Sequence, residues 1–265
     1  MEDLKQIVRD KYAKLASRNE ESCCGPKTSC CDDKEVATIM NEDYSKLDGY
    51  VKDADLQLGC GIPTEFARIK KGDSILDLGS GAGNDVFVAR QLTGESGEVF
   101  GVDFTPEMVT KAQQNKQKLG YTNVHFLQGD IEDLPIPSHS INVAISNCVM
   151  NLVPDKQKAY DEVFRVLKPG GHFSISDIVI RGNLPTAVRN VAELYAGCVS
   201  GATDRDQYLD TITKAGFEAI TIDKERQIDL PDDFLLEHIT PEALAEFRAG
   251  QANIYSINIF GRKPM

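Results

Sequence analysis

The chain has 265 residues and a formal net charge of -12 at pH 7. This length suits one large α/β domain, or a domain with appendages. The acidic balance disfavours a nucleic-acid partner, because no basic surface is available to neutralise phosphates. The first residues lack the apolar segment of a secretion signal, and no apolar run is long enough to span a membrane. We therefore expect a cytoplasmic protein that acts on a small or neutral substrate.

The first segment carries apolar residues at helical spacing, with charged residues between them: Leu4, Ile7, Val8, Tyr12 and Leu15. This pattern predicts an amphipathic helix over residues 2–16 that docks on the main domain. Residues 17–33 are polar and cysteine-rich and contain Gly25-Pro26, which indicates a loop. Residues 59–63 are expected to turn, and Pro63 suits the start of a helix over 64–69.

From Ser74 onward, short apolar strands alternate with helices. The expected strands are residues 74–78, 98–102, 124–127, 141–146 and 172–178. The expected helices are residues 84–92, 106–119 and 155–167, and residues 168–171 are predicted as a sharp turn. This alternation is typical of a parallel sheet with helices on both faces, so it predicts a Rossmann-like, doubly wound α/β fold.

After Ile180 the pattern changes. We expect helices over 185–199 and 204–215, a strand over 219–222, a helical stretch over 231–250 and a last strand over 254–260. The helices after residue 180 are expected to cap the carboxyl ends of the strands, where ligands bind in open α/β sheets. We divide the chain into an N-terminal helix and cysteine-rich segment (1–60), a cofactor-binding domain (61–180), and a cap with a C-terminal α/β region (181–265).

The first strand of this alternation ends in three glycines spaced two apart, in residues 77–83 (DLGSGAG). Glycines allow positive φ angles and a close approach of the backbone to a ligand, and the next helix presents unpaired N–H groups there. Asp103 ends the following strand, where a carboxylate can accept hydrogen bonds from both ribose hydroxyls. A dinucleotide fingerprint would require glycine where Asn84 stands, so the spacing disfavours a nicotinamide cofactor.

Four motifs in chain order resemble those of the class I S-adenosylmethionine-dependent methyltransferases. They are residues 77–83, 129–131 (GDI), 146–147 (SN) and 165–171 (RVLKPGG). The resemblance implies a mostly parallel seven-stranded sheet, S-adenosylmethionine as methyl donor and S-adenosylhomocysteine as product. In that family the acid at Asp103 binds ribose, the glycines line the methionine portion, and the acid at Asp130 meets the adenine amine. The implied cofactor-binding residues are Asp77, Gly79, Ser80, Gly81, Gly83, Asp103, Phe104, Asp130, Ile131 and Asn147.

Two further acids stand near these motifs. Asp85 follows the glycine turn, and it either approaches the amino or carboxylate end of the cofactor or serves as an acid that the helix dipole favours. Asp177 ends the fifth strand at the same rim, where a structural role is open to it.

The seven cysteines fall into two groups. Cys23, Cys24, Cys30 and Cys31 crowd a short polar stretch, whereas Cys60, Cys148 and Cys198 lie far apart. Each of these three, taken alone, is most simply a buried inert thiol. Together they suit a thiophilic centre, because thiolates select soft ligands and trivalent arsenic takes up to three sulfurs while keeping a lone pair that can attack a methyl group. We expect no metal ion, since CC-x5-CC lacks the usual C-x2-C spacing of a zinc site.

The chain as a whole resembles the bacterial arsenite S-adenosylmethionine methyltransferases. The matching stretches are 8–12 (VRDKY), 22–25 (SCCG), 58–61 (LGCG), 146–156 (SNCVMNLVPDK) and 197–202 (GCVSGA). The resemblance implies that Cys148 and Cys198 hold arsenic, that Cys60 assists in binding or redox cycling, and that one N-terminal cysteine joins the cycling. Any of the four N-terminal cysteines could take part in the redox cycling, and Cys30 or Cys31 is favoured because these two lie nearer Cys60 in the chain.

The implied activity is methylation of arsenite or thiol-conjugated trivalent arsenicals for detoxification. Thioredoxin or glutathione would reset the enzyme thiols, and we expect a monomer that binds neither nucleic acid nor membrane. One alternative is a quinone or other small-molecule C-methyltransferase of the same fold, which would leave the cysteines without a task. Another is a non-catalytic arsenite-binding or sensing protein, against which the intact glycine turn and Asp103 argue.

Overall fold

The computed structural model describes residues 2–16, 42–189, 201–250 and 252–265. Its strands form one seven-stranded sheet in the order β3-β2-β1-β4-β5-β7-β6. The strands are β1 (Ser74–Leu78), β2 (Glu98–Asp103), β3 (Val124–Gln128), β4 (Ile141–Asn147), β5 (Leu167–Arg181), β6 (Glu218–Ile228) and β7 (Asn253–Arg262). The first five strands run parallel, and β7 lies antiparallel between β5 and β6. The predicted doubly wound, mostly parallel sheet is confirmed.

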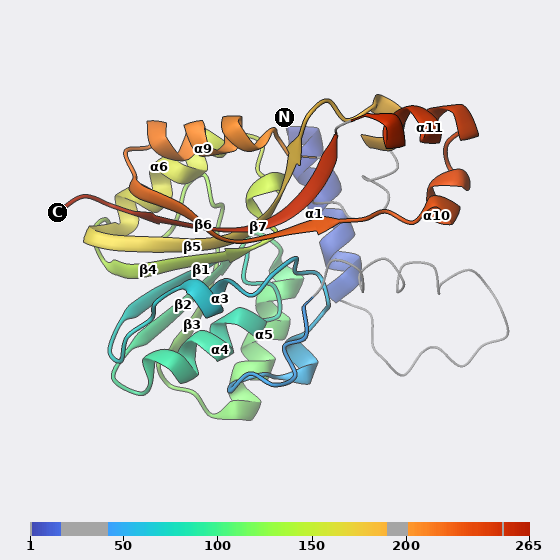
Figure 1. The fold of residues 1–265 in the computed structure, drawn as a ribbon. Coiled ribbons are helices and arrows are strands. Elements are labelled where there is room, and N and C mark those ends of the chain that lie inside the picture. The colour runs from blue at the N-terminus through green and yellow to red at the C-terminus, as the bar shows by residue number, and fades with distance from the viewer. Residues whose placement is uncertain (1, 17–41, 190–200, 251) are drawn as a thin grey trace, which may run out of the picture.

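Helices cover both faces of the sheet (Figure 1). On one face lie α3 (Pro63–Phe66), α4 (Asn84–Thr93) and α5 (Pro106–Leu119), and on the other lie α6 (Lys156–Val166) and α9 (Arg205–Lys214). The N-terminal helix α1 (Glu2–Ala16) has the predicted bounds and packs on α5, which confirms that it docks on the main domain. The remaining short elements are η2 (Lys52–Ala54), η3 (Met150–Leu152), α10 (Asp232–Leu236) and α11 (Pro241–Ala249).

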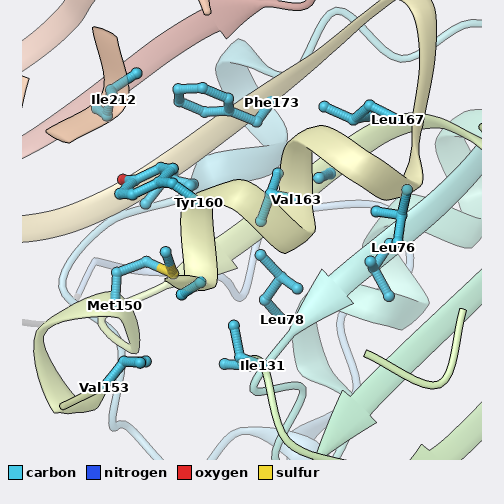
Figure 2. Close-up of a cluster of buried hydrophobic side chains, with 14 of the residues drawn as sticks. Leu76, Leu78, Ile131, Met150, Val153, Tyr160, Val163, Leu167, Phe173 and Ile212 are labelled. Atoms are coloured by element: carbon cyan, nitrogen blue, oxygen red, sulfur yellow. The ribbon is translucent and has the colours of Figure 1, made fainter. Parts of the chain in front are cut away.

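The core has one apolar layer on each face of the sheet. Leu76 and Leu78 of β1 belong to a buried cluster with Tyr160 and Val163 of α6 (Figure 2). Ile75 of the same strand belongs to the cluster that packs against α4 and α5. Successive side chains of a strand point to opposite faces, so a strand buried on both faces must be apolar throughout. Ile75, Leu76 and Leu78 of β1 meet this requirement, whereas the buried Asp77 is the exception and lines a pocket at the end of the strand.

Several local predictions were wrong in the bounds or number of elements; the strand predicted over 219–222, for example, extends over Glu218–Ile228. The helix predicted over 64–69 ends at Phe66, because Arg68 adopts φ 50, which a right-handed helix does not permit. The turn predicted over 168–171 belongs to β5, where Leu167 pairs with Ile141 and regular pairing resumes at residue 172 after a register shift. The helical stretch over 231–250 divides into α10 and α11, since Thr240 caps a new helix that starts at Pro241.

One helix after residue 180 does not lie where the cap was expected. Helix α9 does not cover the strand ends: it packs on α6 and β5, because Tyr208 and Ile212 are buried in the same cluster as Tyr160. Of the helix predicted over 185–199, residues 186–189 are helical, and residues 190–199 lie outside the described residues, as does the whole loop predicted over 17–33. None of the described helices combines the length and the apolar character needed to cross a membrane.

The two-sided core generates a test. Leu76 is fully buried, and its replacement by alanine is expected to lower the free energy of unfolding by about 2–5 kcal/mol. The missing side-chain atoms would leave a cavity that the packed neighbours fill only in part. Leu92 on α4 is 39% exposed, so the matched Leu92→Ala change is expected to stay within about 0.5 kcal/mol. Urea unfolding of both variants checks this, and equal losses would contradict the assignment of the core.

Candidate functional site

A pocket opens at the carboxyl ends of β1, β2 and β4, above the glycine turn. Gly79, Gly81 and Gly83 all have positive φ angles, of 69, 51 and 101 degrees. A Cβ atom added at Gly81 would meet nothing within 4 Å, so the turn is open toward the pocket at this residue. The turn thus leaves its backbone open to close approach by a ligand in the pocket.

Most of the residues predicted to bind the cofactor line this pocket. They are Asp77, Gly79, Ser80, Gly81, Asp103, Phe104, Asp130, Ile131 and Asn147. Gly83 is not among the lining residues. It precedes α4, its N–H donates to the Ser80 carbonyl (2.9 Å), and a Cβ atom there would lie 2.8 Å from the Phe126 ring. The glycine at this position therefore serves the packing of the turn.

Asp103 holds the glycine turn in place. Its carboxylate accepts hydrogen bonds from the backbone N–H groups of Gly81 (2.9 Å) and Thr105 (2.8 Å). The residue is only 8% exposed, and this burial raises the pKa of Asp103 although both hydrogen bonds oppose the rise. The two hydrogen bonds leave lone pairs on the carboxylate for further donors from a ligand.

Buried carboxyl groups make this end of the pocket suited to a cation. Burial, reinforced by the charges of Asp85 and Asp103, raises the pKa of Asp77 well above its usual range. Burial also raises the pKa of Asp85 to about 6. A ligand with a positive charge relieves the cost of ionising such groups, and S-adenosylmethionine carries a sulfonium and an ammonium group. Within the described chain, the buried Ser80 Oγ and Asn84 Oδ1 have no protein partner, so polar atoms also remain for a ligand.

Asn147 joins the pocket wall to the segment that carries Cys60. Its Oδ1 accepts from the Cys60 N–H (3.0 Å), and its Nδ2 donates to the Gly61 carbonyl and to Tyr44 Oη, both at 2.8 Å. Tyr44 is buried, and its Oη lies 2.8 Å from an oxygen of Asp85. Sequence reasoning missed Tyr44, because the segment around it shows no periodic pattern. It also did not predict the hydrogen bond between Asn147 and Cys60, because 87 positions separate the two residues.

The structure brings two of the predicted cysteines together. Cys60 and Cys148 are both buried, and their sulfurs lie within 4.8 Å of each other and of a carboxylate oxygen of Asp177. Cys148 directly follows β4 and has φ 60, a left-handed conformation that is uncommon outside glycine. Such backbone strain persists where the surroundings over-determine it, and it is frequent at functional sites.

The glycines beside Cys60 allow its segment to lie against the end of β4 and against Ser176 of β5. A Cβ atom added at Gly59 would lie 2.6 Å from Asn147 Nδ2, and one at Gly61 would lie 2.7 Å from Ser176 Oγ. Any larger residue at either position would push the segment away from the sheet. This close contact is what places the Cys60 thiol beside that of Cys148.

Asp177 is a buried carboxyl group next to the two thiols. Its Oδ1 accepts from Asn151 Nδ2 and from the Ile178 N–H, and its Oδ2 accepts from Tyr208 Oη, each at 2.9 Å. Burial raises the pKa of Asp177 to about 7, although these hydrogen bonds and the nearby Lys156 charge oppose the rise. Its position near the carboxyl end of β5 was the sequence signal that pointed to this rim.

The N-terminal helix reaches the opposite side of the pocket. Lys5 Nζ lies 2.6 Å from Asp130 Oδ2 and 2.8 Å from Glu132 Oε2, and both Lys5 and Tyr12 line the pocket. Sequence reasoning missed these contacts, since residues more than 120 positions apart make them. The other five predicted cysteines, Cys23, Cys24, Cys30, Cys31 and Cys198, lie outside the described residues.

Comparisons with known proteins agree with this geometry. The family described as "Methyltransferase domain" matches residues 69–216. An arsenite methyltransferase of Halobacterium salinarum is 38% identical over 99% of this chain and 67% of its own length. That of Aquipseudomonas alcaligenes is 33% identical over 95% of this chain and 70% of its own length.

A crystal structure of another protein is also similar to this chain. It is an arsenic(III) S-adenosylmethionine methyltransferase from Chlamydomonas reinhardtii, which superposes with a TM-score of 0.65 at 35% identity, covering 78% of this chain and 68% of that one. The family model and both relatives span the glycine turn, Asp103 and the fourth strand. The chain therefore belongs to the arsenite methyltransferase family of class I methyltransferases, and S-adenosylmethionine is its methyl donor.

Proposed function

We propose that this enzyme methylates trivalent arsenic that is held by the thiolates of Cys60 and Cys148. The observation that carries the proposal is the approach of the two buried sulfurs to within 4.8 Å, with Cys148 lining the pocket above the glycine turn. Relatives that are named arsenite methyltransferases support arsenite as the substrate. When bound, S-adenosylmethionine supplies an electrophilic methyl group for the arsenic lone pair.

The pocket residues have separate tasks in this proposal. The Asp103 carboxylate accepts hydrogen bonds from the ribose hydroxyls, and Asp130 accepts one from the adenine amine. Burial raises the pKa values of Asp77 and Asp85, and the positive end of the bound cofactor favours their ionised forms, so cofactor and carboxylates stabilise each other. Asn147 keeps the Cys60 segment against this wall, so the thiols and the cofactor pocket hold a constant relation. Such positioning removes the need for a chance encounter of the reactants.

The cysteines also serve the redox side of the reaction. Transfer of a methyl cation raises arsenic formally from the trivalent to the pentavalent state. Two thiols that close into a disulfide return two electrons, and thioredoxin or glutathione then reduces the disulfide. In this proposal Cys198 supplies a third sulfur and an N-terminal cysteine takes part in the cycling, both on the strength of the family resemblance. Such a cycle suits arsenic detoxification by a monomer in the reducing cytoplasm.

The thiol pair generates the first test of this function. Replacing Cys60 or Cys148 by serine is expected to lower arsenite methylation on the order of 100-fold or more, because a hydroxyl does not hold arsenic beside the methyl donor. Both methylarsenicals and S-adenosylhomocysteine are measured with the purified protein, S-adenosylmethionine and a thiol reductant.

Binding of S-adenosylmethionine to the same variants is the control, measured by calorimetry, and it is expected to persist. Wild-type protein that binds arsenite without releasing S-adenosylhomocysteine would instead identify an arsenite-binding protein. Full activity in both serine variants would rule out this pair as the arsenic site.

The proposed binding of the cofactor ribose by Asp103 can be tested separately. Asp103→Ala is expected to weaken S-adenosylmethionine binding about tenfold or more, because hydrogen bonds to a charged group are each worth about 1.5–3 kcal/mol. Asp161 is exposed on α6, on the other face of the sheet, so Asp161→Ala is the matched control and is expected to leave the dissociation constant unchanged. Calorimetric titration without arsenic measures both, and similar affinities would contradict the role of Asp103.

A further inference from the structure

Lys5 of α1 is held between two acids at the edge of the cofactor pocket. Its Nζ lies 2.6 Å from Asp130 Oδ2 and 2.8 Å from Glu132 Oε2. Glu132 is the fixed partner, because its side chain is only 11% exposed and its other oxygen accepts from the Asp155 N–H at 3.0 Å. The Lys5 ammonium group therefore joins the N-terminal helix to a buried anchor beside the pocket.

Asp130 is the acid of the two that lines the pocket. One of its oxygens accepts from Lys5, and the other accepts from the Glu132 N–H at 2.9 Å. Burial raises the pKa of Asp130, but these two hydrogen bonds outweigh that effect, so the pKa lies below its usual value. A carboxylate has about four lone-pair positions, so positions remain for a donor from a ligand. Asp130 is thus an ionised acceptor, and each of its oxygens is held by one donor.

Helix α1 presents one face to the pocket. Lys5 and Tyr12 both line the pocket, and residues seven positions apart lie on the same face of a helix. The helix packs on α5, and at its far end Lys111 Nζ lies 3.4 Å from the Ala16 carbonyl oxygen. Lys5 is therefore carried by an element that is itself held against the domain.

We propose that Lys5 is a positioning residue for adenine recognition: it holds the Asp130 carboxylate where this group accepts a hydrogen bond from the adenine amine. The inference rests on the proposed function, in which Asp130 meets that amine, and it adds α1 to the cofactor site. The other acid contacts of Lys5 serve this end, because Glu132 fixes the ammonium group from the buried side.

The physical reason is the cost of covering a charge. The Asp130 side chain is 43% exposed, so a base that fills the pocket removes water from it. An unpaired carboxylate loses its hydration at a high cost, whereas a carboxylate that already has an ion pair and a backbone donor keeps most of its partners. Without Lys5 the carboxylate would turn toward water, and its hydrogen bond to the amine would be lost.

The test compares two ligands by calorimetric titration in the absence of arsenic. One is S-adenosylhomocysteine, and the other is its analogue with hydrogen in place of the adenine amine. The unchanged protein is expected to bind S-adenosylhomocysteine about tenfold or more tightly, because only this ligand offers an amine to Asp130. In Lys5→Met the preference is expected to fall to about threefold or less, chiefly because S-adenosylhomocysteine binds more weakly.

Three further variants serve as controls. Lys5→Arg keeps a cation near both acids, so its preference for the amine is expected to exceed that of Lys5→Met. Lys14→Met removes an exposed lysine from the same helix and is expected to leave both affinities unchanged. In an Asp130→Ala background, Lys5→Met is expected to change the affinity for S-adenosylhomocysteine by less than about twofold, because the group that Lys5 positions is then absent. Circular dichroism checks folding, and Lys5→Gln is the second neutral variant if Lys5→Met does not fold.

A wild-type preference for the amine in Lys5→Met would overturn the inference. Equal losses for both ligands would overturn it too, since Lys5 would then only support the pocket wall, and so would an undiminished effect of Lys5→Met in the Asp130→Ala background. These outcomes leave the proposed methylation of arsenic intact. An unchanged protein with no preference for the amine would overturn the proposed role of Asp130 together with the inference, and one that binds neither ligand would overturn the proposed cofactor site.

Discussion

The site depends on one amide, that of Asn147, which ties the Cys60 segment to the end of β4. Its oxygen accepts from the Cys60 backbone, and its nitrogen donates to the Gly61 carbonyl and to Tyr44. Backbone groups in a buried loop need such partners, because an unpaired buried group costs as much as a lost hydrogen bond. The amide therefore positions a cysteine from one part of the chain beside a cysteine that follows Asn147 itself.

The same region concentrates buried acids. Asp77, Asp85 and Asp177 all have raised pKa values, and in each case burial is the main cause. A fold optimised for stability alone would not retain so many carboxyl groups away from water, and perturbed groups of this kind cluster at functional sites. Here the first two border the pocket for a positively charged cofactor, and the third borders the thiols. The buried acids therefore lie in two groups, one beside the cofactor pocket and one beside the thiols.

Strained and closely packed residues lie in the same region. The left-handed backbone of Cys148 and the close contacts of Gly59 and Gly61 all lie between the cofactor pocket and the thiol pair. These conformations cost free energy and persist only where the surrounding structure holds them in place. The parallel pairing of β4 and β5 holds the backbone in this region. On the sheet face that carries α6 and α9, these two helices bury the aromatic cluster around Tyr160. The Tyr160 hydroxyl donates to Tyr208, which in turn donates to Asp177. The apolar core and the thiol site are thus physically connected.

The sequence alone predicts the alternation of strands and helices, the glycine turn and the acid at Asp103, because these depend on local spacing and on residues next to one another in a strand or turn. It also singled out Cys60 and Cys148 by type and resemblance. The three-dimensional arrangement was needed to see that their sulfurs lie within 4.8 Å of each other and of an Asp177 oxygen, and that Tyr44 and Lys5 line the pocket. Those contacts join residues far apart in the chain, and no local pattern encodes a distance between two separate loops.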